Sequence, residues 1–150
     1  MRLSGIRKKG WFSQNKAGPF LFLGRTKNMA MTADLLIFKK AYQLTQEILQ
    51  TTKLFPKSQR FLMASRLEET SIQILEHIVC ANEVKEKLFF LSKASRLLER
   101  LRILIRLSKD TCYIDFTRYE RLCRAADEIG RMLGGWIKYS SGKKNREDLS

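Results

Sequence analysis

Apolar residues recur every three or four positions along most of this chain, a spacing that places them on one face of an α-helix. Four stretches follow the pattern, at 33–53, 57–81, 84–109 and 116–139. Short links separate them, and prolines and glycines are few. The sequence therefore predicts an all-α fold, an up-down-up-down antiparallel four-helix bundle.

Residues at the helix ends agree with these boundaries. Thr32 is the predicted N-cap of the first helix, Pro56 suits the start of the second, and Asn82 is the predicted cap of the third. Thr117 begins a capping box at the fourth helix. The run Ser140-Ser141-Gly142 is predicted to end that helix.

The same periodicity predicts which side chains are buried in each helix. The predicted stripes are Phe38, Ala41, Tyr42, Thr45, Ile48, Leu49 and Thr52 in the first helix, Phe61, Ala64, Leu67, Ser71, Ile74, Leu75 and Ile78 in the second, and Leu91, Ala94, Leu97, Leu98, Leu101, Leu104 and Ile105 in the third.

The bundle is predicted to occupy residues 31–139, between two segments of different character. Residues 1–30 form a basic leader with aromatic clusters, which is either a nucleic-acid-binding arm or the product of a misassigned start, since Met29 and Met31 stand just before the first helix. Residues 140–150 are predicted to be a disordered charged tail. No run is long enough to cross a membrane, and three cysteines without a C-x-x-C spacing favour a cytoplasmic protein.

The formal net charge is +14, which attracts polyanions. Nucleic acid, an anionic membrane surface and an acidic protein all satisfy this charge. Half of the excess lies in residues 1–30, which contain seven basic residues and no acidic one. The bundle itself is therefore only mildly basic, and the positions of its cations say more about the partner than its net charge does.

The third helix carries the most informative cations. On a helical wheel, Arg102 and Arg106 share one flank, while Arg96 and Arg100 lie almost opposite the apolar stripe. Glu99 is the only carboxylate nearby in the sequence. Cations without local partners favour an external polyanion, and unpaired surface arginines are the alternative.

The fourth helix repeats Arg124, Arg131 and Lys138 every seven residues. Glu120 and Asp127 precede the two arginines by four positions, a spacing that favours ion pairs within one helix. This stripe is therefore interpreted mainly as a solvated, salt-bridged face.

Two further groups predict packing. Ile103 and Leu107 lie beside Arg96 and Arg100, away from the core stripe, and indicate either a second buried surface for self-association or a partner, or two isolated exposed side chains. Gly130 and Gly134 are one helical turn apart, with Trp136 beside them. They are predicted to allow close approach of another backbone.

Catalysis has little support in the sequence. His77 is the only histidine, so no histidine–carboxylate set and no metal-ligand pair is present. Glu68, Glu69 and Glu76 do not make a carboxylate metal bundle, because that site type needs further histidines. We expect no catalytic residue, no metal, no cofactor, no small-molecule substrate and no membrane partner.

Three segments carry a resemblance to a known family. These are FPKSQRF at 55–61, LERLRILIRL at 98–107 and IGRMLGGWIK at 129–138. Together they resemble the accessory variability determinant (Avd) of diversity-generating retroelements, over about 34–138. The bundle proteins encoded by intervening sequences in ribosomal RNA genes are wider relatives. Their S-I-x-x-N-I-A-E-G signature is absent here, where residues 71–77 read SIQILEH.

The resemblance implies a specific role. Family members form a positively charged homopentameric ring, bind the retroelement's reverse transcriptase and its template RNA or RNA/cDNA, and support mutagenic copying. The alternative is a protein–protein scaffold of the intervening-sequence type with no retroelement role. The predicted nucleic-acid-binding residues are Arg96, Arg100, Arg102 and Arg106, followed by Arg60, Arg66, Arg131 and Lys138.

Overall fold

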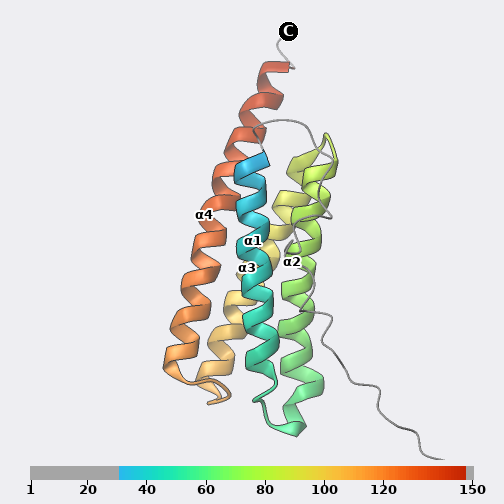
Figure 1. Cartoon of the computed structure of the whole chain (residues 1–150). Coiled ribbons are helices and arrows are strands. Elements are labelled where there is room, and N and C mark those ends of the chain that lie inside the picture. The colour runs from blue at the N-terminus through green and yellow to red at the C-terminus, as the bar shows by residue number, and fades with distance from the viewer. Residues whose placement is uncertain (1–30, 148–150) are drawn as a thin grey trace, which may run out of the picture. The chain divides into compact units, whose positions relative to one another are not determined.

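The computed structural model describes residues 31–147, and side chains within 35–142. This part of the chain contains four long helices and no strand, as predicted. Neighbouring helices run antiparallel, up-down-up-down (Figure 1). The helices are α1 (Met31–Thr52), α2 (Ser65–Glu83), α3 (Lys87–Asp110) and α4 (Phe116–Glu147), and a 3₁₀ turn (Lys57–Gln59) and a π-helical turn (Arg60–Ala64) precede α2. The predicted leader at 1–30 lies outside the described residues.

Each helix contacts two others, so the four enclose one core. A side-chain contact joins every neighbouring pair: Thr45 donates to the Ser71 carbonyl between α1 and α2, the His77 and Phe90 rings stand 6.1 Å apart between α2 and α3, Arg102 and Asp127 join α3 to α4, and Lys40 and Glu128 join α4 to α1. No described helix combines the length and apolar character needed to cross a bilayer.

The buried stripe of α3 is confirmed, with Leu91, Leu98 and Ile105 fully enclosed. The stripe of α1 is rotated from the prediction, because Ile37 and Leu44 occupy the core. Phe38, Tyr42 and Leu49 are only half-buried in consequence.

The prediction that Phe61 is buried was wrong, since its side chain is 91% exposed. The α-helical period of α2 does not continue back to this residue. Phe61 lies in the π-helical turn, whose wider hydrogen bonding changes the direction in which successive side chains point. Phe55, in the link before it, enters the core instead.

Three predicted helix ends differ from the structure. Thr32 already lies within α1, and Asn82 lies within α2, which continues to Glu83. At α4 the cap is Asp115 rather than Thr117, because the Asp115 Oδ1 atom accepts a hydrogen bond from the Arg118 backbone N–H at 2.8 Å.

The predicted end of α4 was also wrong, because the helix continues past Ser140-Ser141-Gly142 to Glu147. The hydroxyl of Ser141 donates to the carbonyl oxygen of Ile137, one turn earlier, at 2.9 Å. Because the hydroxyl bonds to a carbonyl oxygen of the preceding turn, Ser141 does not draw the backbone into a non-helical conformation. Residues 140–147 are therefore helical rather than part of a disordered tail.

The link between α3 and α4 is a tight turn. The backbone N–H of Cys112 bonds to the Lys109 carbonyl, and that of Tyr113 bonds to the Ser108 carbonyl. These two bonds define a Schellman motif, in which the residue at Cys112 must be left-handed. Cys112 has a φ of 59°, in a position that glycine usually occupies.

Candidate nucleic-acid interface

Arg102 is held between α3 and α4. Its Nη2 atom lies 3.0 Å from the Asp127 carboxylate and donates to the Ala126 carbonyl at 3.4 Å, while Nη1 pairs with Glu99. The Arg102 side chain is only 30% exposed. The expectation that this arginine lacks carboxylate partners was therefore wrong, and its guanidinium fastens two helices together.

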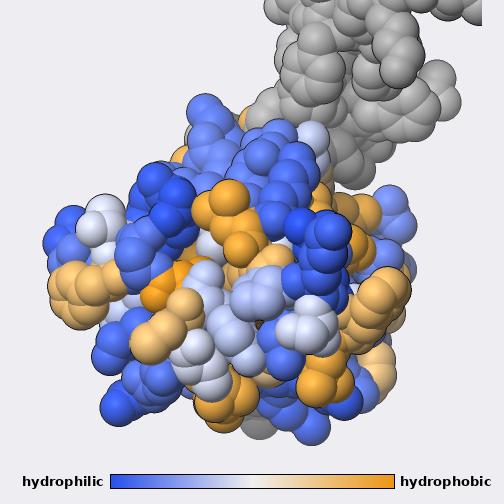
Figure 2. Space-filling view, turned by 90° about the horizontal axis from the view of Figure 1, so that it is seen from below, coloured by the Kyte–Doolittle hydropathy of each residue, from blue (hydrophilic) through white to orange (hydrophobic). Residues whose placement is uncertain are grey.

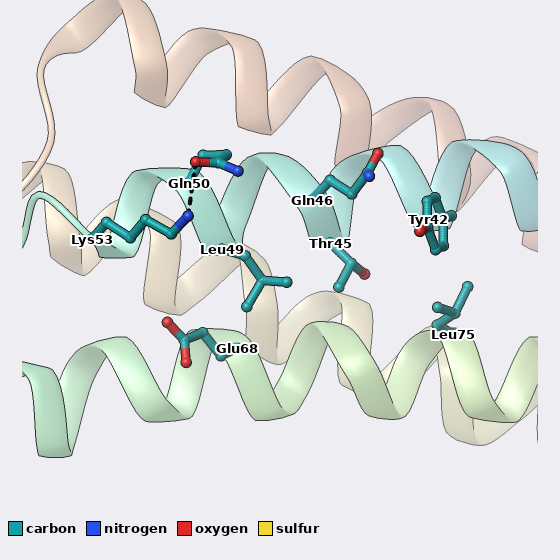
Figure 3. Close-up of a pocket in the computed structure, with 8 residues that line it drawn as sticks. All are labelled: Tyr42, Thr45, Gln46, Leu49, Gln50, Lys53, Glu68 and Leu75. Carbon is teal, nitrogen blue, oxygen red and sulfur yellow. Dashed lines mark hydrogen bonds between the residues drawn. The ribbon is translucent and has the colours of Figure 1, made fainter. Parts of the chain in front are cut away.

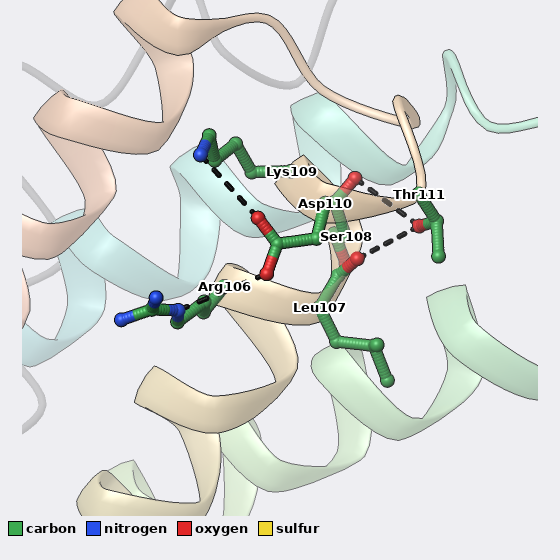
Figure 4. Close-up of polar contacts among 6 residues, drawn as sticks. All are labelled: Arg106, Leu107, Ser108, Lys109, Asp110 and Thr111. Atoms are coloured by element: carbon green, nitrogen blue, oxygen red, sulfur yellow. Dashed lines mark hydrogen bonds and ion pairs between the residues drawn. The ribbon is translucent and has the colours of Figure 1, made fainter.

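Arg106 and Lys109 share the carboxylate of Asp110 (Figure 4). The distance from Arg106 Nε to the carboxylate is 3.7 Å, and the arginine side chain is 74% exposed. Exposed pairs of this kind contribute about 0–1 kcal/mol. Arg106 thus has a partner that the helical wheel did not predict, but the pair is weak enough to open.

Arg96 and Arg100 are exposed on α3, as the wheel predicted. Among the described side chains, no ion pair includes either of them. Lys93, on the same side of the helix, lies 5.4 Å from the centre of the Phe89 ring. This outward side of α3 is therefore cationic.

On α4, the predicted pair between Arg124 and Glu120 is confirmed at 2.6 Å. The predicted pair between Arg131 and Asp127 was wrong, because Asp127 lies on the flank toward α3 and binds Arg102 there. Arg131 is left exposed, and no ion pair within residues 35–142 includes it or Lys138.

Arg60 and Arg66 differ from each other. The Arg60 guanidinium donates to the carbonyl oxygens of Lys53 and Phe55, at 3.3 and 3.5 Å, and so binds the link that follows α1. Arg66 is exposed on α2, and it joins none of the ion pairs in the described part of the chain.

Gly130 and Gly134 were predicted to allow another backbone to approach α4, and neither has a backbone of another helix against it. A Cβ atom at Gly130 would stand 2.6 Å from Arg102 Nη2, so this glycine makes room for a side chain rather than a backbone. At Gly134 nothing lies within 4 Å of that point. Trp136 is half-buried against the core, with Lys87 Nζ 5.4 Å from its ring centre.

The exposure predicted for Ile103 and Leu107 is confirmed, at 68% and 44%. Figure 4 shows the Leu107 side chain on the opposite side of α3 from Arg106 and Lys109. Sequence reasoning missed Phe89, which is also exposed on this helix. The signal was present, because Phe89 precedes Lys93, Arg96 and Arg100 at the same alternating spacing of four and three.

Exposed apolar side chains also gather at the end of the bundle that carries the α1–α2 and α3–α4 links. Figure 2 views this end and shows hydrophobic surface between hydrophilic patches. The residues are Leu54, Phe61, Leu62 and Phe116. Only Phe61 was singled out from the sequence, and then as a core residue.

A groove of about 430 Å³ runs between α1 and α2 (Figure 3). Leu49 and Thr45 point into it from α1, opposite Glu68 and Leu75 of α2. The Thr52 hydroxyl donates to Glu68, and Lys53 bonds to Gln50 at 3.1 Å. These polar side chains satisfy one another and do not form a nucleophile paired with a base.

The Cys123 thiol likewise lacks the features of a reactive site. Burial raises the pKa of Cys123, which also shares a hydrogen bond with the Tyr119 hydroxyl. That bond raises the pKa of Tyr119. Raised pKa values keep both groups protonated, whereas a nucleophilic cysteine needs a lowered pKa. Within the described residues, no group of three or more potential ligands is placed to hold a metal ion.

Comparisons with known proteins agree with this fold. The model of the bAvd-like family matches residues 35–140, nearly the whole bundle. A crystal structure of a protein of unknown function from the S23 ribosomal protein family of Bacteroides thetaiotaomicron is similar, with a TM-score of 0.66 and 21% sequence identity over 71% of this chain and 98% of the other. No curated protein matches the chain.

Proposed function

The chain belongs to the bAvd-like family, and on this premise we propose that it is a non-catalytic, cytoplasmic accessory subunit of a diversity-generating retroelement. In this role it binds the template RNA or RNA/cDNA through cationic contacts with phosphates and supports mutagenic copying by the reverse transcriptase. It acts as a homo-oligomeric ring, for which the family resemblance implies five copies.

One observation supports the RNA-binding part above all. Because Arg102 binds Asp127, Arg131 is left as an exposed cation on α4, and Lys138, seven residues later, is exposed as well. The helix then continues to Glu147, and the sequence of this extension contains Lys143, Lys144 and Arg146. A row of cations along a helix suits a nucleic-acid backbone, which it binds with little regard to sequence.

The cations of α3 contribute unequally to this surface. Arg96 and Arg100 are exposed and outside the described ion pairs, and Arg106 is weakly paired. Arg102 is fastened to α4 and is the least suited of the four to meet a phosphate. The strongest candidates for RNA contact thus lie on α4, and Arg96 and Arg100 remain available for a different partner.

Charge reversal tests the RNA-binding surface. We expect Arg131→Glu with Lys138→Glu to weaken binding of template RNA at least tenfold in a fluorescence anisotropy titration. The matched control is Lys39→Glu with Lys57→Glu, which changes the net charge equally at two exposed positions away from α4. Equal affinity of the two variants would contradict a role for the α4 face.

Copurification separates the retroelement role from the alternative, a protein–protein scaffold. The full chain is captured with and without nuclease treatment, and the reverse transcriptase is detected by blotting. Loss of the reverse transcriptase after nuclease supports a contact through RNA. Retention would indicate a direct protein contact and would also support the retroelement role. Absence of the reverse transcriptase from both captures, together with no RNA binding by the purified chain, favours the scaffold.

A further inference from the structure

Helices α2 and α3 carry opposite charge. Residues 65–83 contain four acidic residues and one basic residue, whereas residues 87–110 contain seven basic and two acidic ones. Both helices have an outward row of side chains at alternating spacings of three and four, the spacing of a helix–helix seam. The rows are the α2 seam (Ser65, Glu69, Ile72, Glu76, Val79 and Glu83) and the α3 seam (Phe89, Lys93, Arg96, Arg100, Ile103 and Leu107).

The two seams match in chemistry as well as in spacing. Each contains apolar side chains that are at least partly exposed, Ile72 and Val79 in the α2 seam and Phe89, Ile103 and Leu107 in the α3 seam. Charged residues stand between these apolar positions in both. The charges are negative in one seam and positive in the other.

The distribution of ion pairs leaves these charges unmatched among the described side chains. Every described carboxylate of α1, α3 and α4 belongs to an ion pair, whereas none of the α2 carboxylates does. Glu69 accepts a hydrogen bond from Gln73 at 2.6 Å, which leaves its charge uncompensated. No described ion pair joins α2 to α3, although the two helices are neighbours in the bundle.

We propose that the α2 seam of one copy packs antiparallel against the α3 seam of the next copy. The proposal deepens the self-association included in the proposed function and rests on it. A contact between two α3 seams would instead place Arg96 and Arg100 against their own copies, which like charges disfavour. Two different surfaces meeting head to tail make a heterologous contact, the kind that generates rings.

The register follows from a contact inside each chain. His77 of α2 lies level with Phe90 of α3, where their rings meet. Copies related by rotation about an axis parallel to the bundle keep the same levels. Stepping along both helices from the ring contact brings Glu69 to within two residues, about 3 Å, of the level of Arg100. Glu76 reaches the level of Lys93 with the same offset, and these long side chains span such a distance.

Paired charge reversals test this contact in the full chain. The α2 variant carries Glu69→Arg and Glu76→Arg, and the α3 variant carries Lys93→Glu and Arg100→Glu. Multi-angle light scattering of nuclease-treated protein should show the wild type as an oligomer and each variant as a single chain. Circular dichroism confirms that both remain folded, and Lys39→Glu, on another helix, should assemble like the wild type.

Mixing the two variants provides the decisive measurement. Each variant alone places like charges together at every contact, whereas a contact between the two variants places opposite charges together, so association should return on mixing. A closed ring of five copies cannot alternate fully and keeps one like-charged contact, so the mixture should form open oligomers or rings with an even number of copies. If the charges of α2 and α3 instead paired within one chain, mixing two variants could not restore the pair. Only a single chain that carries all four changes would do so. A monomeric wild type, assembly of either variant alone, or no recovery on mixing would each overturn the proposal.

The assembly measurement is independent of RNA. The variant with Arg131→Glu and Lys138→Glu should assemble normally although its RNA binding is reduced. If the purified wild type bound no RNA but the seam variants assembled as predicted, the interface would be supported and the nucleic-acid role would not. Normal RNA binding by a chain whose assembly ignores both seams would retain the proposed function and refute the interface.

Discussion

The Nη2 atom of Arg102 lies over Gly130, 2.6 Å from the point where a Cβ atom would stand. The same nitrogen reaches Asp127 at 3.0 Å and the carbonyl oxygen of Ala126 at 3.4 Å. A glycine on α4 thus accommodates an arginine of α3, and this arginine decides which cations of α4 keep a carboxylate. The packing of Arg102 on Gly130 therefore affects the surface charge, because it takes Asp127 away from Arg131.

The contrast between Gly130 and Gly134 can be measured. Gly134→Ala should raise the free energy of unfolding by about 0.5–1 kcal/mol, because alanine favours a helix and the space is open. Gly130→Ala should gain less or lose stability, since Arg102 must move. Denaturant unfolding measures both, and adding Arg102→Ala should let Gly130→Ala recover its gain. A full gain at Gly130 with Arg102 present would contradict the packing described.

Phe55 and Phe61 should respond in opposite ways to truncation. Phe55→Ala removes a buried ring that contacts Tyr113, with the ring centres 5.4 Å apart, and should cost about 3–5 kcal/mol. Phe61→Ala should change stability by less than about 0.5 kcal/mol, because the side chain is exposed. Urea unfolding compares them. A large loss at Phe61 would mean that another surface covers it.

These differences show where sequence reasoning reaches its limit in this fold. Periodicity predicted four helices and the buried stripe of α3, because both depend on residues close in sequence. It did not predict that Asp127 binds Arg102 rather than Arg131, because that choice depends on how α4 is rotated against α3. The position of Phe61 depends on a π-helical turn, which a helical wheel cannot represent because it assumes the regular period of an α-helix.

The candidate site was predictable to a similar extent. The exposure of Arg96, Arg100, Ile103 and Leu107 follows from the wheel alone. The weak pairing of Arg106 was missed, although Asp110 stands four residues later in the sequence. The matching row on α2 was not predicted, because acidic residues spaced along a helix indicate a partner only when a basic row of the same spacing is compared with them.

Asp115 should make stability depend on pH in the acid range. The hydrogen bond from the Arg118 backbone N–H, aided by the Arg118 guanidinium, lowers the pKa of this carboxyl below its ordinary value. A lowered pKa stabilises the folded chain above the unfolded-state value, and the effect is lost as the pH falls through the folded-state value. Asp115→Asn keeps a capping side chain but removes this dependence.

Thermal unfolding from pH 7 to pH 2 measures the effect of Asp115. The wild type should be more stable than Asp115→Asn near neutrality, and the difference should shrink toward zero as the pH falls through the folded-state pKa of Asp115. A difference that does not change with pH would show that the Asp115 charge does not contribute.

Salt dependence should count the phosphate contacts of α4. Replacing Arg131 and Lys138 by glutamine should reduce the slope of log K against log salt by about 0.7 per residue for single-stranded RNA, hence about 1.4 in total. Lys39→Gln with Lys57→Gln is the control and should leave the slope nearly unchanged. Filter binding between about 50 and 200 mM salt measures both slopes. An unchanged slope in the α4 variant would exclude these two contacts.

Cys112→Gly should stabilise the protein by about 0.5–1 kcal/mol. Glycine adopts a positive φ without the steric penalty that a Cβ atom brings, and this gain exceeds its greater loss of backbone entropy. Cys112→Ala keeps the Cβ atom and should show no such gain, which makes it the control. Equal unfolding midpoints for the glycine and alanine variants would contradict strain at this turn.

The turn at Cys112 also bears on how the gene can change. Cysteine and glycine codons differ by a single base, so the relaxed turn is one mutation away from the strained one. Proteins drift just above the stability that folding requires and rarely approach their optimum. The strained turn can therefore persist although a stabilising change lies one base away, because selection removes only changes that take the protein below that stability.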